Sequence, residues 1–102
     1  MEKNISAKQK QDIQVKMVSA IHHALSHKSA SPDASIENIM AEVVKFSSAQ
    51  KDNVMKFSMI AAASKALDIS ERNPKLKDRD ILAKVLPELQ TLIAVVAEDH
   101  LK

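Results

Sequence analysis

Apolar residues recur every three or four positions along most of this chain, which is the spacing of one face of an α-helix. Near the C-terminal end, for example, Leu89, Leu92, Ile93 and Val96 follow this spacing. Polar stretches that carry helix-start residues separate the apolar segments. The pattern predicts helices at residues 7–28, 32–46, 49–70, 78–86 and 87–100.

The pattern of apolar positions also repeats along the chain. When the sequence is shifted by 42 positions, residues 6–44 align with residues 48–86 without a gap, and ten of the 39 pairs are identical. Such self-similarity is typical of a duplicated supersecondary unit that cannot bury its apolar face alone. The identical pairs are Ser6/Ser48, Ala7/Ala49, Met17/Met59, Ala20/Ala62, Ala24/Ala66, Leu25/Leu67, Pro32/Pro74, Ile39/Ile81, Ala41/Ala83 and Val43/Val85.

This self-similarity predicts a specific architecture. We expect an all-α fold, a five-helix bundle built from two pseudo-twofold-related helix–loop–helix repeats (6–44 and 48–86) plus a C-terminal helix. Residues 1–102 would form a single all-α domain, because 102 residues are enough for one core. A fragment of a helical solenoid is the alternative, but such arrays need about three repeats for stability.

Several residues indicate where the helices begin and end. Ser6 with Gln9 forms a capping-box pattern, and Ser48 stands at the equivalent place before the third helix. Ser31 precedes Pro32 and therefore resembles the N-cap of the second helix, with proline at its first position. In the second copy, Asp78 competes with Asn73 as the N-cap. Pro87 predicts a break or a sharp kink before the last helix.

Alanines mark a possible close approach of the first and third helices. Ala20 and Ala24 are one turn apart, and Ala62 and Ala66 repeat this arrangement. Small side chains one turn apart let two helix axes approach toward the short end of the usual 8–10 Å separation. We expect the two helices to cross there, although alanine is also simply a good helix former.

Composition narrows the classes of protein that the chain can represent. Glycine is absent, which argues against β-hairpins and against glycine-rich phosphate-binding loops. The formal charge of +2 is small, and the two signs are interspersed. Without cysteine there is no disulfide or thiol chemistry, which fits a reducing compartment. No apolar run approaches the ~20 residues of a membrane helix. We therefore expect a cytoplasmic protein without membrane contact.

Catalytic and metal-binding patterns are weak. His23 and His27 are four positions apart and point to one side of a helix, but two histidines are an incomplete metal site. We interpret them as part of a solvated face. No serine, threonine or lysine sits in an activated arrangement that would support catalysis. We therefore expect no enzyme activity, no metal, no cofactor and no small-molecule substrate.

Apolar side chains in excess of the expected core favour a protein-interaction module. Methionine-rich helix faces suit the binding of varied partners, although a bundle can also bury such a face under its last helix. The last helix carries an apolar residue off its main face, which favours self-association into a homodimer. The residues predicted to bind a partner are Met55, Met59, Leu92, Val95 and Val96.

A small nucleic-acid-associated regulator is the second hypothesis. Two basic zones could hold phosphates, but acidic residues interrupt both, and no aromatic residue is placed to stack on a base. The basic residues concerned are Lys8, Lys10, Lys16, Lys75, Lys77 and Arg79.

Overall fold

The helical periodicity of the sequence produces helices along nearly the whole chain. A computed structural model describes residues 6–100, with the side chains of residues 6–99. Within that range every regular element is helical, so the all-α class is confirmed. The elements are α1 (Ala7–Ala30), α2 (Ile36–Ser47), α3 (Asn53–Arg72), α4 (Asp78–Val85), the 3₁₀-helix η1 (Leu86–Glu88) and α5 (Leu89–His100).

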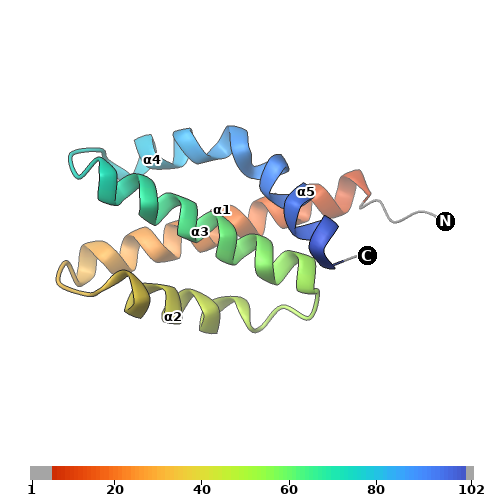
Figure 1. The fold of residues 1–102 in the computed structure, drawn as a ribbon, viewed down its shortest axis with the longest axis horizontal. Coiled ribbons are helices and arrows are strands. Elements are labelled where there is room, and N and C mark those ends of the chain that lie inside the picture. Colours follow the sequence, from red (N-terminus) through yellow and green to blue (C-terminus); the bar gives the residue numbers. More distant parts are fainter. Residues whose placement is uncertain (1–5, 101–102) are drawn as a thin grey trace.

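Helices α1 and α3 form the centre of an elongated molecule measuring 47 × 25 × 19 Å. They run in the same direction, and the contact between them is the most extensive in the fold (Figure 1). Helix α2 runs back along one side of this pair, and α4 with α5 runs back along the other side. Each flanking segment packs against both central helices.

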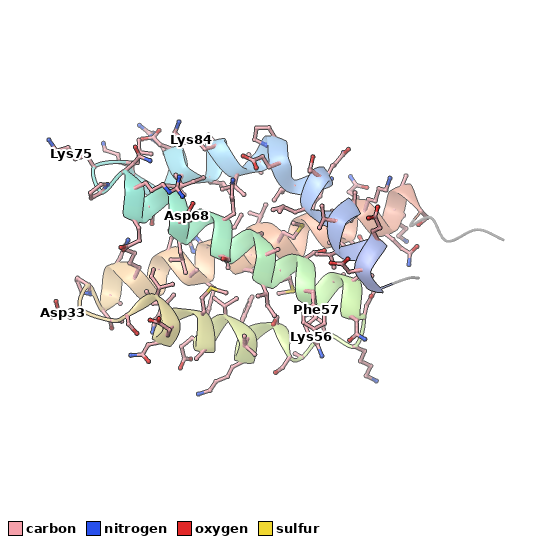
Figure 2. The ribbon with its side chains drawn as sticks, in the orientation of Figure 1. Asp33, Lys56, Phe57, Asp68, Lys75 and Lys84 are labelled. Carbon is pink, nitrogen blue, oxygen red and sulfur yellow. The ribbon has the colours of Figure 1, made fainter. Side chains whose placement is uncertain are left out.

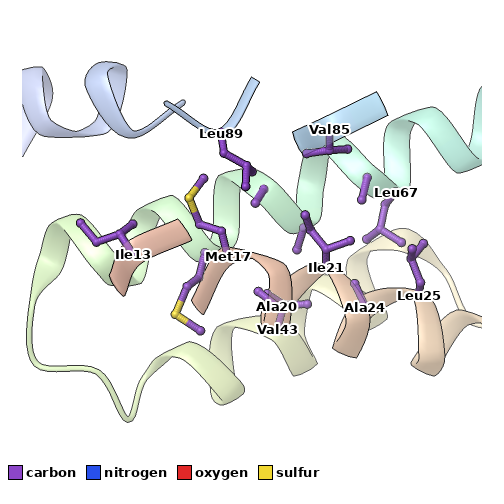
Figure 3. Close-up of a cluster of buried hydrophobic side chains, with 14 of the residues drawn as sticks. Ile13, Met17, Ala20, Ile21, Ala24, Leu25, Val43, Leu67, Val85 and Leu89 are labelled. Carbon is purple, nitrogen blue, oxygen red and sulfur yellow. The ribbon is translucent and has the colours of Figure 1, made fainter. Parts of the chain in front are cut away.

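The core lies where the apolar rows of α1 and α3 meet and extends to both flanking segments (Figure 3). Ala20, Ala24, Ala62 and Ala66 have no exposed surface, so the small residues of both central helices face inward. Large aliphatic side chains and two methionines fill the space around them. The largest buried members are Ile13, Met17, Ile21, Ile39, Met59, Leu67, Ile81, Ile93, Val43 and Val85.

A break or a sharp kink was predicted at Pro87, and the break is wrong, because the backbone stays helical through this point. Leu86 has φ −49° and ψ −46°, and Leu89 has φ −60° and ψ −43°. Proline lacks the N–H of an α-helical hydrogen bond, and the short 3₁₀-helix around Pro87 accommodates that loss. The last three elements therefore form one continuous helical segment. In residues 6–100 the fold has four helical segments, rather than the five separate helices that we expected.

The first helix starts as predicted, whereas the second starts later. Ser6 accepts a hydrogen bond from the Gln9 backbone (3.1 Å), and the Gln9 side chain accepts one from the Ser6 backbone (3.1 Å). Ser31 is the C-cap of α1, because its N–H donates to the His27 carbonyl (2.9 Å). Ser35 caps α2 instead, by accepting from the Asn38 N–H (3.1 Å).

Two further predicted N-caps are corrected in the second half of the chain. Ser48 ends α2, and Asp52 caps α3 by accepting a hydrogen bond from the Val54 N–H (2.9 Å). Lys77 precedes α4 without a side-chain cap, so Asp78 is the first helical residue. The carboxylates of Asp78 and Asp80 in this first turn suit the positive end of the helix dipole.

Candidate docking groove

The predicted partner-binding residues lie around the contact between α3 and α5, but they differ in exposure. Met59 has no exposed surface and Val96 is 9% exposed, so both belong to the core and offer a partner almost no surface. This corrects the assignment of these two residues to a docking surface, because α5 packs against α3 and both are buried. Met55 and Leu92 are half-buried, and Val95 is 56% exposed.

An open hollow lies elsewhere, on the outer side of α1. This hollow, here called the α1–α4 groove, has a volume of about 650 Å³ and is open to solvent. It is bounded by the middle of α1, the last turn of α2 and the first turns of α4. The lining residues are Val18, Ser19, Ile21, His22, His23, Leu25, Phe46, Asp78, Arg79 and Leu82.

The floor of the groove follows from helical spacing. Val18, Ile21 and Leu25 are three or four positions apart, so they form one stripe on α1. Ile21 and Leu25 are buried, while Val18 remains half-exposed. Leu82 reaches the same hollow from α4 and is also half-buried. The floor is therefore apolar and accessible at its edges.

One wall of the groove is an aromatic stack between two helices. The imidazole of His23 on α1 and the ring of Phe46 on α2 are parallel within 9°, with their centroids 4.5 Å apart. His23 is half-buried and stacks on Phe46, so it is less exposed than the solvated face that we expected. Such ring contacts stabilise a fold by about 0.5–1.5 kcal/mol beyond area burial. The stack links α1 to the end of α2.

The rim of the groove carries polar groups of both signs. His22 is exposed beside the floor, and Arg79 and Asp78 stand at the start of α4. Within residues 6–99, Arg79 has no ion-pair partner, whereas Arg72 pairs with Asp68 at 3.3 Å. A free guanidinium at the edge of an apolar hollow can fix the orientation of an acidic partner group.

The two predicted basic zones do not form one surface. Lys8, Lys10 and Lys16 lie in the first half of α1, at the end of the molecule where α1 begins (Figure 1). Lys75 lies at the opposite end of the molecule, the end that also carries Asp33 in the other interhelical connection (Figure 2). Lys8 and Lys10 therefore lie toward one end of the 47 Å long axis and Lys75 toward the other, whereas Arg79 lines the same groove as the middle of α1.

The described residues offer neither a cluster of metal ligands nor a helix suited to a membrane. No three His, Asp or Glu side chains in this part of the chain are grouped so that they could hold a metal ion. None of the helices between residues 6 and 100 combines the length and the apolar character needed to cross a membrane.

Comparison with known proteins gives no family assignment. No protein-family model matches the chain, and the searches of curated proteins and of solved structures found no significant match. The function must therefore be argued from the groove and its surroundings.

Proposed function

We propose that this protein is a non-enzymatic interaction module that binds a helix of a partner protein in the α1–α4 groove. The observation that carries the proposal is a solvent-open hollow of about 650 Å³ with an apolar floor between two helices. Helix-in-groove recognition needs such a surface, because the partner contributes an apolar stripe at helical spacing. A cytoplasmic location belongs to the same proposal and is supported by the lack of cysteine.

We also infer that the chain descends from a duplicated helical hairpin with pseudo-twofold symmetry. Ser31 and Asn73, which are 42 positions apart, end α1 and α3 with nearly the same backbone angles, −134°/76° and −135°/71°. Their carbonyls accept equivalent hydrogen bonds, from Ala34 (2.9 Å) and Leu76 (3.0 Å). Helices α2 and α4 then begin 42 positions apart. Equivalent local sequences thus have equivalent local structures.

Two contacts between helices support the proposed symmetry. The Lys28 ammonium donates to the Ser70 hydroxyl at 2.8 Å, and these residues are equivalent under the repeat. Equivalent residues touch each other only close to a twofold axis. His23 stacks on Phe46, and the residues 42 positions later, Lys65 and Glu88, form an ion pair at 3.3 Å. The same interhelical contact is therefore apolar in one copy and ionic in the other.

This difference between the two copies supports a specialised groove on the α1 side. A His–Phe stack leaves an apolar wall next to the hollow, whereas an ion pair at the equivalent place gives a charged surface. Apolar walls increase the area that a docked helix can bury, and buried area drives most protein association. We infer that the two copies diverged in this function.

Nucleic-acid binding remains the alternative proposal, and the arrangement of charges supports it less. The zone around Lys75, Lys77 and Arg79 is the more compact of the two, and Asp78 and Asp80 lie within it. A duplex would therefore find few phosphate contacts on any one face.

Affinity capture from native lysate with matched variants tests the proposed function. Ser19→Trp fills the hollow from an exposed position of α1 and leaves the core unchanged. Val44→Glu is the control, since Val44 is 47% exposed on α2 and does not line the groove. We expect a partner that the wild type and Val44→Glu retain and that Ser19→Trp loses. A partner retained equally by Ser19→Trp, or the absence of any specific partner, would refute docking in the groove.

A further inference from the structure

We propose that the α1–α4 groove binds the outer face of α5 from a second copy of this chain. The inference rests on the proposed function and names the occupant of the same groove. It joins two surfaces that residues 6–99 leave uncovered: the open apolar hollow on α1 and an exposed apolar residue on α5.

The outer face of α5 carries one exposed large apolar residue, Val95, with small and polar residues around it. Its exposed positions include Thr91, Ala94, Val95 and Glu98, which recur at helical spacing. Val95 is 56% exposed at the centre of this face, while Leu89 and Ile93 on the opposite side are buried in the core. A partner groove would thus receive Val95 without any change in the packing of α5 within its own chain.

Charge complementarity favours this occupant. Glu98 and Asp99 lie one turn after the apolar centre, are exposed, and have no ion-pair partner within the described residues. Arg79 at the rim of the groove is likewise unpaired over the same range, and the His22 imidazole lies exposed beside it. A docked α5 that places Val95 over the floor can bring its carboxylates to these groups.

The opposing charge at the rim limits how the two copies can pair. Asp78 adjoins Arg79 and would repel the carboxylates of the incoming helix, so net attraction is small and depends on close pairing with Arg79. The interaction is therefore sensitive to single charges. Each copy carries one groove and one α5 face, so it can donate and accept at the same time.

Sedimentation velocity of the full chain over a range of concentrations tests this pairing. We expect the wild type to sediment faster as concentration rises, and Val95→Asp to weaken self-association at least about tenfold, as the loss of a central apolar contact does. Val44→Asp is the matched control, because Val44 is similarly exposed on α2 and should leave association unchanged. Circular dichroism confirms that both variants remain folded.

A charge exchange identifies the groups that pair. Arg79→Glu and Glu98→Arg should each weaken association several-fold, and the double variant should recover most of the loss, because the pair is rebuilt with reversed signs. A monomer at every concentration would overturn the inference, as would association that Val44→Asp weakens and Val95→Asp does not. If the wild type is monomeric but captures a different protein that Ser19→Trp loses, the proposed function stands. Only the second copy as the occupant of the groove is then excluded.

Discussion

The contact between α1 and α3 gives the sharpest prediction about stability. Ala24 and Ala66 are equivalent positions of the two central helices, and neither has any exposed surface. Replacement by leucine adds three carbon atoms at a place where no free space is accessible. Overpacking of this kind costs about 1–3 kcal/mol, because neighbouring side chains and backbone must move. We therefore expect Ala24→Leu and Ala66→Leu each to lower the free energy of unfolding by about 2 kcal/mol.

The repeat also supplies matched controls for this experiment. Ala41 and Ala83 are identical under the same 42-residue shift and lie in helices, but both are exposed. Leucine there should change the free energy of unfolding by no more than about 0.5 kcal/mol, as is usual for surface substitutions. The comparison therefore separates packing at the central contact from any general effect of leucine in a helix.

Urea unfolding followed by circular dichroism provides the measurement. For a small domain with a slope of about 2 kcal/mol per M, a loss of 2 kcal/mol lowers the midpoint by about 1 M. Ala24→Leu and Ala66→Leu should show that shift to a similar extent, and Ala41→Leu and Ala83→Leu should not. Midpoints that are unchanged in both buried variants would refute close packing of α1 on α3 at the alanines.

Further predictions concern single contacts. Met59→Ala should lower the free energy of unfolding by about 2–5 kcal/mol in urea titrations, because the side chain is fully buried; a neutral result would contradict its place in the core. Phe46→Ala should lower the free energy of unfolding by at least about 1 kcal/mol, because the stack on His23 is lost. Val44→Ala is the control in the same urea titration, and equal effects of the two variants would argue against the stack. Lys28→Ala should lower the free energy of unfolding, measured by thermal unfolding, by no more than about 1 kcal/mol, because the partner Glu71 is largely exposed. Fluorescence anisotropy with duplex DNA should give a log–log salt slope no steeper than about −3, since only three cations cluster around residues 75–79.

The sequence was informative about helices and core because both depend on a local period. Ile13, Met17 and Ile21 follow the spacing of one helix face, and all three are buried. The repeat extended this reasoning to α3, whose Met59 and Leu67 are buried like their counterparts in α1. These features need only the positions of apolar residues along the chain.

Helix starts were predicted less well, because several polar residues compete within each connection. Ser31, Ser35 and Asp33 all lie within five positions, and Ser31 prolongs α1 by donating its N–H to His27 instead of capping α2. Pro87 was expected to break or sharply kink the chain, but a 3₁₀ turn keeps the backbone helical there. Local rules identify the candidates, and tertiary packing selects among them.

The groove could not be predicted from the sequence. The groove depends on the distance between α4 and α1, and the spacing of apolar residues in the sequence does not determine that distance. Val18 and Leu25 belong to an apolar row of α1, and only the structure shows that both line an open hollow. The opposite error occurred on α3, where Met59 was predicted to bind a partner but is buried and inaccessible.

An intermolecular spin-label experiment tests the central claim, that the α1–α4 groove receives α5 of a second copy, most directly. The chain has no cysteine, so Thr91→Cys provides a single attachment site on the outer face of α5 that leaves Val95 intact. Spin-labelled unenriched protein is mixed with ¹⁵N-labelled wild type, and the broadening of amide signals is measured. We predict broadening at Ser19, His22 and Arg79 around the groove. Broadening centred on Val44 of α2, or none at any residue, would contradict the account.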